Sequence, residues 1–186
     1  MELFIRPAGP ADAEEIAEVQ RLSWNAAYEG MLSAGSLATV ARAWDAAHWR
    51  RSLERTDDRA ITLVLDGRAT GVAGFGVAGR RRGRRMALAG FDGEIYLLYL
   101  APGAQRLGHG ARLMASLARV LIARGIGSGV VWALARNRPA LDFYRRMGGR
   151  KLAEARRPFF EEIVDEVALG WDDLQTLIGA ARSVRE

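Results

Sequence analysis

The sequence predicts a single mixed α/β domain of the α+β type over residues 1–186, with helices packed on a central sheet of about seven strands. The chain of 186 residues is long enough for one domain with a sizeable core. Hydrophobic residues make up 49% of it and charged residues 26%, as in ordinary globular proteins. Its apolar spacing switches between the periods of helices and strands, and no repeat, low-complexity segment or linker divides it.

The beginning of the chain is expected to form a short strand and two helices. Phe4-Ile5 starts the strand, and Arg6-Pro7 ends it. Pro10 suits a first helical turn, where its missing N–H has no partner to lose. Apolar residues then recur at helical spacing, which predicts a helix over residues 10–28. A second helical stretch is expected over residues 34–54.

In the middle of the chain the spacing of apolar residues is typical of β-strands. Residues 61–65 and 69–77 are expected to pair as a hairpin around Asp66-Gly67, a dipeptide that tight hairpin turns prefer. Residues 91–100 form the clearest strand of the chain. Residues 108–123 form the clearest helix, because their apolar side chains fall on one face.

The last part of the chain is expected to add three strands and two helices. Asn137 suits the N-cap of a helix that Gly148-Gly149 ends. The other elements are strands at residues 130–134, 151–155 and 163–169 and a short helix at residues 172–178.

Composition removes several classes of site. The chain has no Cys, and therefore no disulfide, thiolate nucleophile or Cys-based metal centre. Its two histidines, His48 and His109, are too few for a His-rich metal site. The net charge of +5 suits a phosphate-bearing partner, whether a small molecule or a nucleic acid. Without a signal peptide or an apolar run of ~20 residues, the protein is expected in the cytoplasm.

The passage from the residue 91–100 strand to the residue 108–123 helix is the most informative segment. The turn Gln105–Gly110 reads Gln-Arg-Leu-Gly-His-Gly. A helix start leaves backbone N–H groups unpaired at the positive end of the helix dipole. Gly108 and Gly110 let an anion approach these donors, and Arg106 adds positive charge. The turn therefore predicts a phosphate cradle, with glycines placed only for close packing as the alternative.

Two better-known phosphate loops fit this turn poorly. A Walker loop needs a lysine after its glycines, and the only lysine of the chain is Lys151. A Rossmann fingerprint follows the first strand of a βαβ unit, whereas these glycines come after an expected antiparallel hairpin.

The order of the neighbouring segments carries a resemblance. A strand, the pattern Q-x-x-G-x-G, an amphipathic helix, another strand and then Asn137 and Tyr144 follow one another within residues 60–170. In this order the chain resembles the GCN5-related N-acetyltransferase (GNAT) superfamily. Residues 3–25 fit the first strand and helix of that family more loosely. The resemblance implies a mostly antiparallel mixed sheet, splayed at an acyl-CoA site and flanked by helices on both faces.

The resemblance also implies an activity and a donor site. An acetyl group would pass from acetyl-CoA to a primary amine by direct attack in a ternary complex, with no metal. The pantetheine arm would lie along the strand like an added strand, and the pyrophosphate would lie on the turn. For Asn137, which would contact the cofactor arm, a simple N-cap is the alternative. The implied cofactor-binding residues are Leu98, Tyr99, Leu100, Gln105, Arg106, Leu107, Gly108, His109, Gly110, Ala111 and Asn137.

The resemblance assigns two catalytic residues. Tyr144 matches a general acid that protonates the departing CoA thiolate, with an aromatic packed on the sheet as the alternative. Glu94 matches a glutamate that serves some members as base. At ~3.3 Å per residue it lies too far from Leu100 to reach the same cofactor atoms, so it would act through water. A solvated strand-end carboxylate is its alternative. Other members place a glutamate where this chain has Trp132.

The acceptor side is marked by aromatic residues. Trp24 and Tyr28, four residues apart near a helix end, are expected to line the acceptor site, although this spacing also suits a core. Further aromatic candidates are Trp44, Trp49, Phe159 and Phe160. Glu161-Glu162 would attract a cationic amine or simply form the last hairpin. The acceptor is expected to be a small-molecule or peptide amine, and dimers are common among proteins with this resemblance.

The run Arg80–Arg85 is expected to be a solvated loop. The alternative is that this run contacts the adenosine 3′-phosphate, an acidic substrate or RNA.

Two other functions are weighed against acetyl transfer. A non-catalytic acyl-CoA-binding regulatory domain would keep the cradle but would not need Tyr144 and Glu94. A nucleic-acid binder built on the arginines would need interleaved aromatic residues, which this run lacks, so nucleic acid is not the expected partner.

Overall fold

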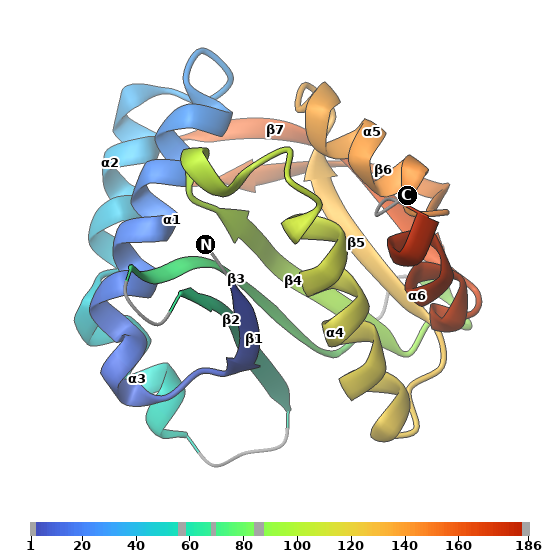
Figure 1. Cartoon of the computed structure of the whole chain (residues 1–186). Coiled ribbons are helices and arrows are strands. Elements are labelled where there is room, and N and C mark those ends of the chain that lie inside the picture. The colour runs from blue at the N-terminus through green and yellow to red at the C-terminus, as the bar shows by residue number, and fades with distance from the viewer. Residues whose placement is uncertain (1–2, 56–58, 68–69, 84–87, 184–186) are drawn as a thin grey trace.

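The computed structural model describes residues 3–55, 59–67, 70–83 and 88–183. Within these ranges one sheet of seven strands has the order β1-β2-β3-β4-β5-β7-β6 (Figure 1). The strands are β1 (Phe4–Pro7), β2 (Ala60–Gly67), β3 (Gly71–Arg80), β4 (Gly93–Leu100), β5 (Gly129–Leu134), β6 (Arg150–Phe159) and β7 (Glu162–Trp171). β4 and β5 run parallel and the other neighbouring pairs antiparallel, which confirms the expected mixed sheet.

Helices cover both faces of the sheet. They are α1 (Ala13–Tyr28), α2 (Ala34–Ala43), α3 (Ala46–Glu54), α4 (His109–Ala123), α5 (Arg138–Arg146) and α6 (Leu174–Ser183), with 3-10 turns η1 (Pro10–Asp12) and η3 (Pro102–Ala104). α1, α2 and α3 gather at one side of the molecule, and α4, α5 and α6 at the other (Figure 1). None of the described helices is long and apolar enough to cross a bilayer.

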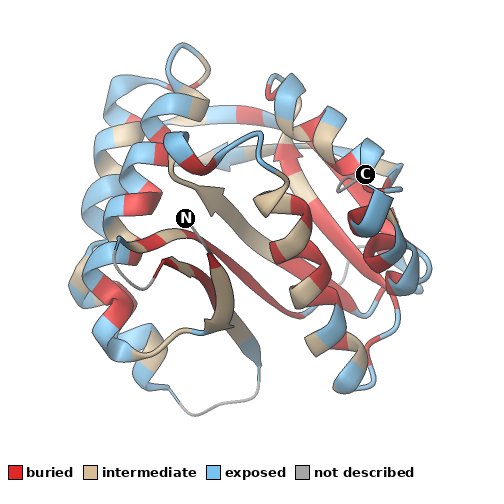
Figure 2. Ribbon diagram, in the orientation of Figure 1, coloured by how far each residue is buried: buried red, intermediate tan, exposed pale blue. Residues whose placement is uncertain are grey.

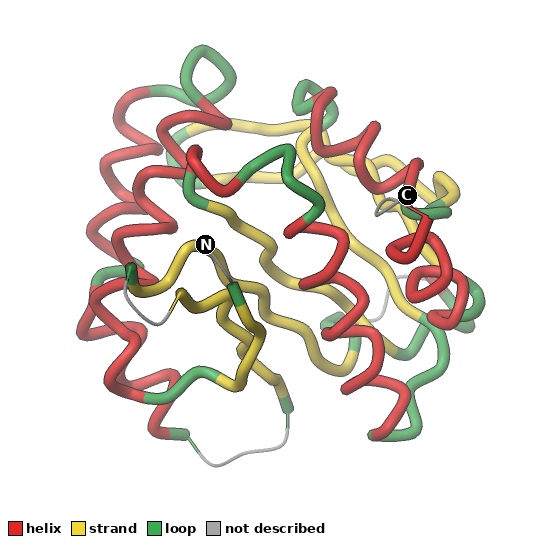
Figure 3. Tube along the Cα trace, viewed as in Figure 1, coloured by secondary structure: helices red, strands yellow, loops and turns green. Residues whose placement is uncertain are grey.

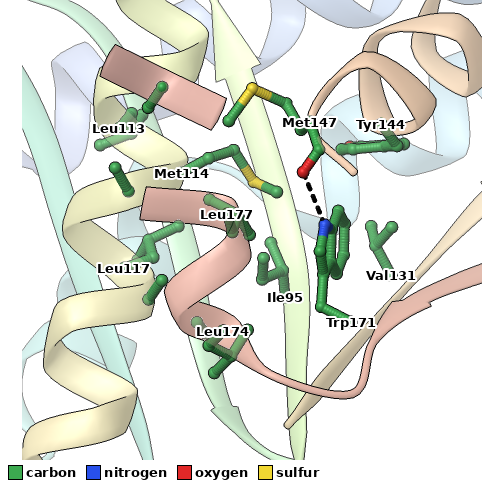
Figure 4. Packing of buried hydrophobic residues seen from close by; sticks show 14 of the residues in the cluster. Ile95, Leu113, Met114, Leu117, Val131, Tyr144, Met147, Trp171, Leu174 and Leu177 are labelled. Atoms are coloured by element: carbon green, nitrogen blue, oxygen red, sulfur yellow. Dashed lines mark hydrogen bonds between the residues drawn. The ribbon is translucent and has the colours of Figure 1, made fainter. Parts of the chain in front are cut away.

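Each face of the sheet has its own core. On one face, α4 and α6 bury leucines such as Leu113 and Leu177 against Ile95 of β4 (Figure 4). Trp171, at the end of β7, lies in the same cluster, and its Nε1 donates to the Met147 carbonyl at 2.8 Å, which fixes the end of α5. On the other face, α1 and α3 pack on Phe75 and its neighbours in β2 and β3. β4 contributes to both of these cores, through Ile95 on one face and Tyr96 and Leu97 on the other.

The prediction of a single helical stretch over residues 34–54 is wrong, because the chain forms two helices there. Asp45 takes an extended conformation, and its carboxylate accepts from the His48 N–H at 2.8 Å. This side-chain cap starts α3 afresh after α2 has ended at Ala43.

Two strand boundaries also differ from the prediction. Asp66-Gly67 does not form the hairpin turn, since both residues belong to β2 and the turn closes through the Thr70 N–H on the Gly67 carbonyl at 2.7 Å. Arg6 and Pro7 still pair with β2, so β1 ends at Pro7 and not before Arg6. One interaction explains both differences, because Arg6 Nε donates to the Asp66 carboxylate at 2.7 Å across the two strands.

Candidate functional site

Strands β4 and β5 pair only where they begin. The register joins Gly93–Ile95 to Gly129–Val131 and then stops. On the other side of β4, the pairing with β3 skips Tyr96, as in a β-bulge. A bulge bends its strand and increases the local twist. The second half of β4 therefore turns away from β5, and its residues are half-buried where those of the first half are buried (Figure 2).

The backbone of β4 presents polar groups to the gap that opens there. The Ala101 N–H donates to the Ala73 carbonyl of the β3 chain. Since alternate residues of an antiparallel strand point the same way, the backbone of Tyr99 faces β3, and that of Leu98 and Leu100 faces the gap.

One of these gap-facing groups is already engaged. The Leu100 carbonyl accepts from Ser23 Oγ at 2.8 Å and from Gln105 Nε2 at 3.0 Å. The N–H and carbonyl of Leu98 and the N–H of Leu100 remain as the groups that point into the gap.

A loop with a short 3-10 turn joins β4 to the start of α4 (Figure 3). After η3, Arg106 and Gly108 both have left-handed backbone angles, with φ of 62° and 76°. Gly108 is the N-cap of α4, and the first bond that closes α4 runs from the Arg112 N–H to its carbonyl at 3.1 Å. The N–H groups of the first turn therefore have no partner inside the helix. This arrangement of helix start and left-handed residues is typical of an anion-binding nest.

Not every side chain of the turn faces the same way. Leu107 is 64% exposed. Burial, followed by the charge of Arg112, lowers the pKa of His109. Arg112 itself is held by the Leu3 carbonyl at 2.8 Å and lies 3.3 Å from His109 Nδ1. Arg106 is thus the exposed positive charge of this turn.

Asn137 and Tyr144 lie on α5, across the gap from β4. The Asn137 side chain caps α5, accepting from the Ala140 N–H at 3.1 Å, and the residue is buried. Tyr144 is also buried. Burial and the nearby Tyr28 raise the pKa of Tyr144 well above its ordinary value, so its hydroxyl is protonated at neutral pH.

The buried Tyr144 and the half-buried Tyr28 and Tyr99 gather where the two strands part. Burial raises the pKa of Tyr28, and hydrogen bonding to Tyr99 and Asn137 partly offsets this effect. Burial and the neighbouring Tyr28 likewise raise the pKa of Tyr99, with Tyr144 close enough to add to the effect. The three tyrosines and Asn137 therefore form one uncharged polar cluster at the gap.

A hollow of about 360 Å³ joins these groups on the α4 and α5 side. We call it the donor hollow, after the acyl-donor site that the sequence predicts here. Of the residues expected from the sequence, it is lined by Tyr28, Leu98, Tyr99, Leu100, Gln105, Arg106, Gly108, Gly110, Ala111, Asn137 and Tyr144. Leu107 and His109 lie outside its lining, as do Trp24 and Glu94. The turn, the strand edge and α5 thus meet in one place, as their order in the sequence suggested.

A second hollow, of about 710 Å³, lies on the α1–α3 side of the sheet. We call it the acceptor-side hollow. Trp24, Tyr28 and Glu94 line it, and it shares six lining residues with the donor hollow, namely Tyr28, Tyr96, Leu97, Tyr99, Trp132 and Ala133. The gap between β4 and β5 therefore joins a hollow on one face of the sheet to a hollow on the other.

Glu94 is not the solvated carboxylate that its position suggested as the alternative. Its side chain is 8% exposed. Oε1 accepts from the Arg82 guanidinium at 3.0 Å, and Oε2 accepts from the Arg82 backbone N–H at 2.9 Å. Arg82 also covers the Tyr96 ring, with its guanidinium 3.8 Å from the ring centroid.

The prediction that Arg80–Arg85 forms a solvated loop is therefore correct only in part. Arg81 is tied to the Phe91 and Gly83 carbonyls, and Arg82 belongs to the wall of the acceptor-side hollow. Arg84 and Arg85 lie outside the described residues.

The last hairpin contributes residues that sequence reasoning missed. Glu166 and Arg157 line the acceptor-side hollow and form an ion pair. The alternation of β7 carries a signal for Glu166, since Val164, Glu166 and Ala168 must share one face. Phe159 lines the same hollow, whereas Phe160 is exposed at the hairpin tip, so Phe160 and Glu161 form the connection of the last two strands.

No group of three or more metal-ligating side chains occurs among the residues that the structure describes.

Aromatic rings pack closely around Trp24. Its ring centroid lies 4.6 Å from that of Tyr28 and 6.0 Å from that of Phe159, with which it is stacked. Trp44 meets it edge-on at 5.7 Å. The pair expected to line the acceptor site thus lies at the inner end of an aromatic cluster.

Comparison with known proteins gives consistent matches. A family model described as "Acetyltransferase (GNAT) family" matches residues 16–149. An uncharacterized N-acetyltransferase, YuaI of Bacillus subtilis (strain 168), is 31% identical over 176 residues, covering 93% of this chain and 95% of that protein.

Solved structures of similar fold include two with bound coenzyme. PaiA N-acetyltransferase from Thermoplasma acidophilum, in complex with coenzyme A, has a TM-score of 0.71 and 20% identity, over 89% of this chain and 98% of that chain. YncA from Salmonella typhimurium, with its cofactor acetyl-CoA, has a TM-score of 0.61 and 17% identity, over 94% and 95% of the two chains. At these identities the likeness concerns the fold.

Proposed function

The chain belongs to the GNAT family of acetyltransferases, and from this premise we propose that it moves an acetyl group from acetyl-CoA to a primary amine by direct attack in a ternary complex. Members of this family are acyl-CoA-dependent N-acyltransferases. Membership therefore favours an enzyme over a non-catalytic acyl-CoA-binding domain. The acceptor is a small-molecule or peptide amine. The continuous seven-stranded sheet supports one N-acetyltransferase domain over residues 1–186. A cytoplasmic location stays a prediction from the sequence.

In this proposal the donor hollow holds acetyl-CoA. The gap-facing backbone groups of Leu98 and the N–H of Leu100 bind the amides of the pantetheine arm, as a neighbouring strand would. Tyr99 contributes through its side chain, because its backbone is paired with β3. The N–H groups from Gly108 to Ala111, with Arg106, hold the pyrophosphate at the positive end of α4. Leu107 and His109 contribute through the backbone of the same turn. Asn137 contacts the arm while it caps α5.

Tyr144 acts as the general acid. The amine nitrogen forms a bond to the acetyl carbon, and the carbon–sulfur bond of the thioester breaks. The Tyr144 hydroxyl gives its proton to the leaving thiolate and recovers one from solvent. Its buried position supports this role, since a hydroxyl with a raised pKa remains a proton donor at neutral and mildly alkaline pH.

Glu94 acts as the base through water. The amine is an ammonium ion at neutral pH and must lose a proton before its nitrogen can attack. Glu94 lines the acceptor-side hollow, while Tyr144 lines only the donor hollow. Base and acid therefore approach the gap from opposite faces of the sheet. Both oxygens of Glu94 accept from Arg82, so a water must carry the proton to this carboxylate.

The observation that carries the proposal is the meeting of three features in the donor hollow: the open edge of β4, the nest at the start of α4, and Tyr144. Gly110 offers a direct test. A Cβ built on it would lie 3.4 Å from Leu100 Cδ1 and 3.5 Å from the Phe143 ring, which are ordinary contacts. Gly110→Ala should therefore fold, while its methyl group obstructs the first turn of α4.

We expect calorimetric titration with acetyl-CoA to show an affinity at least about tenfold lower for Gly110→Ala, a loss of ~1.4 kcal/mol. Gly103→Ala is the matched control, because no described residue other than its chain neighbours has an atom within 4 Å of the added Cβ. Its affinity should equal that of the unmodified protein. Equal affinity for both variants would contradict the placement of the pyrophosphate on this turn.

A further inference from the structure

Eight of the described residues that line the acceptor-side hollow are aromatic, and they indicate what kind of amine it takes. This inference rests on the proposed function, because it concerns the second substrate of the same reaction. The volume of about 710 Å³ lies within the range of small-molecule pockets. The aromatic lining residues are Trp24, Tyr28, Trp44, Trp49, Tyr96, Tyr99, Trp132 and Phe159.

The charged groups of this hollow come in balanced pairs. Arg82 pairs with Glu94 at 3.0 Å, and Arg157 pairs with Glu166. Among the described lining residues these two arginines and two glutamates cancel. A pocket built for a polycation, such as a polyamine, would carry an excess of carboxylates. The balance therefore favours an acceptor with a single positive charge.

The two carboxylates differ in what they can still bind. Both oxygens of Glu94 accept hydrogen bonds from Arg82. Glu166 engages Arg157 through Oε2 alone, and its Oε1 accepts no hydrogen bond from the described residues. Its side chain is 17% exposed. Glu166 therefore offers an ammonium ion one ready acceptor inside the hollow.

Glu166 also stands close to the reacting end. It pairs in register with Leu134 at the end of β5, one of the two strands that border the gap, and its charge contributes to the raised pKa of Tyr28. Tyr28 lines both hollows and lies near the hydroxyl of Tyr144. An amine bound at Glu166 Oε1 is thus beside the gap through which the thioester is reached.

The aromatic cluster adds a second, independent indication of a ligand. Trp24 is 7% exposed, and its Nε1 has no hydrogen-bond partner in the described part of the chain. This N–H lies near the Tyr99 hydroxyl on the wall of the hollow, but it does not reach hydrogen-bond geometry. Such a buried donor costs free energy until a ligand or a water satisfies it. Aromatic faces attract cations and repel anions, so they disfavour an acceptor that carries a carboxylate.

We propose that the acceptor is a primary monoamine on an aromatic body, which lies among the rings around Trp24 with its ammonium group on Glu166. Arg157 engages Glu166 through Oε2 and leaves Oε1 to the amine. Its guanidinium lies 4.9 Å from the centroid of Trp132, which fixes its position against the floor of the hollow. Glu166 is thus a specificity-determining residue for the acceptor, distinct from Glu94.

Matched pairs of amines test the class, with thiol release from acetyl-CoA as the readout. Phenethylamine and phenylalanine differ by one carboxylate, and hexylamine and hexamethylenediamine differ by one ammonium group. In each pair kcat/KM should be at least about tenfold higher for the monoamine without the extra charge. Phenethylamine should exceed hexylamine. A preference for the diamine or for phenylalanine would overturn the inference.

Glu166→Gln tests the residue. KM for phenethylamine should rise about tenfold or more, with kcat changed less than about threefold, since a charge-assisted hydrogen bond in the bound state is lost. Glu154→Gln is the control, because Glu154 is an exposed, ion-paired glutamate on the neighbouring strand β6. Its kinetic constants should stay within about twofold. An unchanged KM in Glu166→Gln would refute the assignment.

Two further measurements keep the outcomes separate. If Glu166→Gln fails to fold because Arg157 loses its partner, Glu166→Asp retains the charge and withdraws the carboxylate by one methylene, so KM for phenethylamine should still rise severalfold, and an unchanged KM would refute the assignment. Calorimetry with acetyl-CoA should give the same affinity in every variant. Thiol release with no amine at all would count against the proposed function, whereas release with the wrong amines would count against the acceptor class alone.

Discussion

Replacing Tyr144 with Phe removes one buried hydroxyl and leaves the ring that packs. The ring centroid of Tyr144 lies 5.3 Å from that of Phe143 and 6.4 Å from that of Trp171, and Phe retains both contacts. Burial raises the pKa of the hydroxyl above its ordinary value of 10.0, and Tyr28 adds to the effect. The group that is lost is therefore a protonated donor at the pH of any ordinary assay.

The cost should fall on the chemical step. A positioned general acid contributes about 10²–10⁴-fold, which corresponds to roughly 2.7–5.5 kcal/mol of activation free energy. The free energy of unfolding should change by no more than about 1 kcal/mol, the net value of a typical hydrogen bond. The affinity for acetyl-CoA should change less than about threefold, because backbone groups make most of the assigned donor contacts.

The assay is thiol release from acetyl-CoA under saturating amine. Calorimetry and thermal unfolding on the same preparations show whether binding or folding has changed. A kcat within about twofold of the unmodified protein would refute the role of Tyr144 as acid. A fall in kcat matched by an equal loss of acetyl-CoA affinity would instead assign Tyr144 to binding.

The remaining predictions concern pH, the N-terminal ion pairs and the cofactor turn. The amine must be neutral to attack and Tyr144 must be neutral to donate. Because the pKa of Tyr144 is raised, kcat/KM for the amine should climb from about pH 6 to pH 9 with no falling limb below about pH 10; an alkaline fall near pH 8 would point to another acid. Hydrogen bonding to Arg6 lowers the pKa of Asp12 in the folded chain, so its contribution to stability is present above the unfolded value and is lost as pH falls through the folded one. Asp12→Asn should therefore cost about 1–3 kcal/mol of unfolding free energy at pH 7, measured by urea denaturation, and the difference should shrink near pH 2; a difference that persists in acid would show that the charge is irrelevant. Arg106→Asn removes the exposed charge of the turn but tolerates its φ of 62°. It should leave stability within about 0.5 kcal/mol and weaken acetyl-CoA binding, most clearly at low salt; unchanged binding at low salt would exclude Arg106 from the site.

Local signals were enough to predict most of the fold. The start of α4 is one example, since the glycines of the turn and the apolar face that follows place it within one residue of His109. Asn137 is another, because its N-cap role was weighed from the sequence and its side chain does cap α5. Each of these features depends on residues that are close in sequence, which is why a single chain suffices to predict them.

The errors arose where a distant or competing contact decides the structure. The Asp66-Gly67 dipeptide favours a turn, yet Asp66 is held within β2 by Arg6, sixty residues earlier in the chain. In the residue 34–54 stretch, helical spacing on both sides masks the cap by Asp45. Neither effect can be read from periodicity.

In the candidate site, too, features that depend on neighbouring residues were predicted, and features that depend on distant contacts were not. The turn and the α5 residues were predicted, because their pattern is contiguous. In the wall of the acceptor-side hollow the aromatic candidates were predicted, whereas the charged residues Arg82, Arg157 and Glu166 were missed, because they come from a loop and two different strands. Only the pairing of β7 with β5 and β6 brings Arg157 and Glu166 beside the gap. Their charges alone gave no indication of this place.

In the proposed reaction an amine and acetyl-CoA meet in the gap between β4 and β5, and the acetyl group passes directly to the amine. Initial rates measured over a grid of both substrates, with the N-acetyl amine and free CoA quantified by mass spectrometry, distinguish this direct transfer from other routes. We expect one N-acetyl amine for each CoA released and intersecting double-reciprocal lines, as a ternary complex requires. Parallel lines, or CoA released without an acetylated amine, would rule out direct transfer.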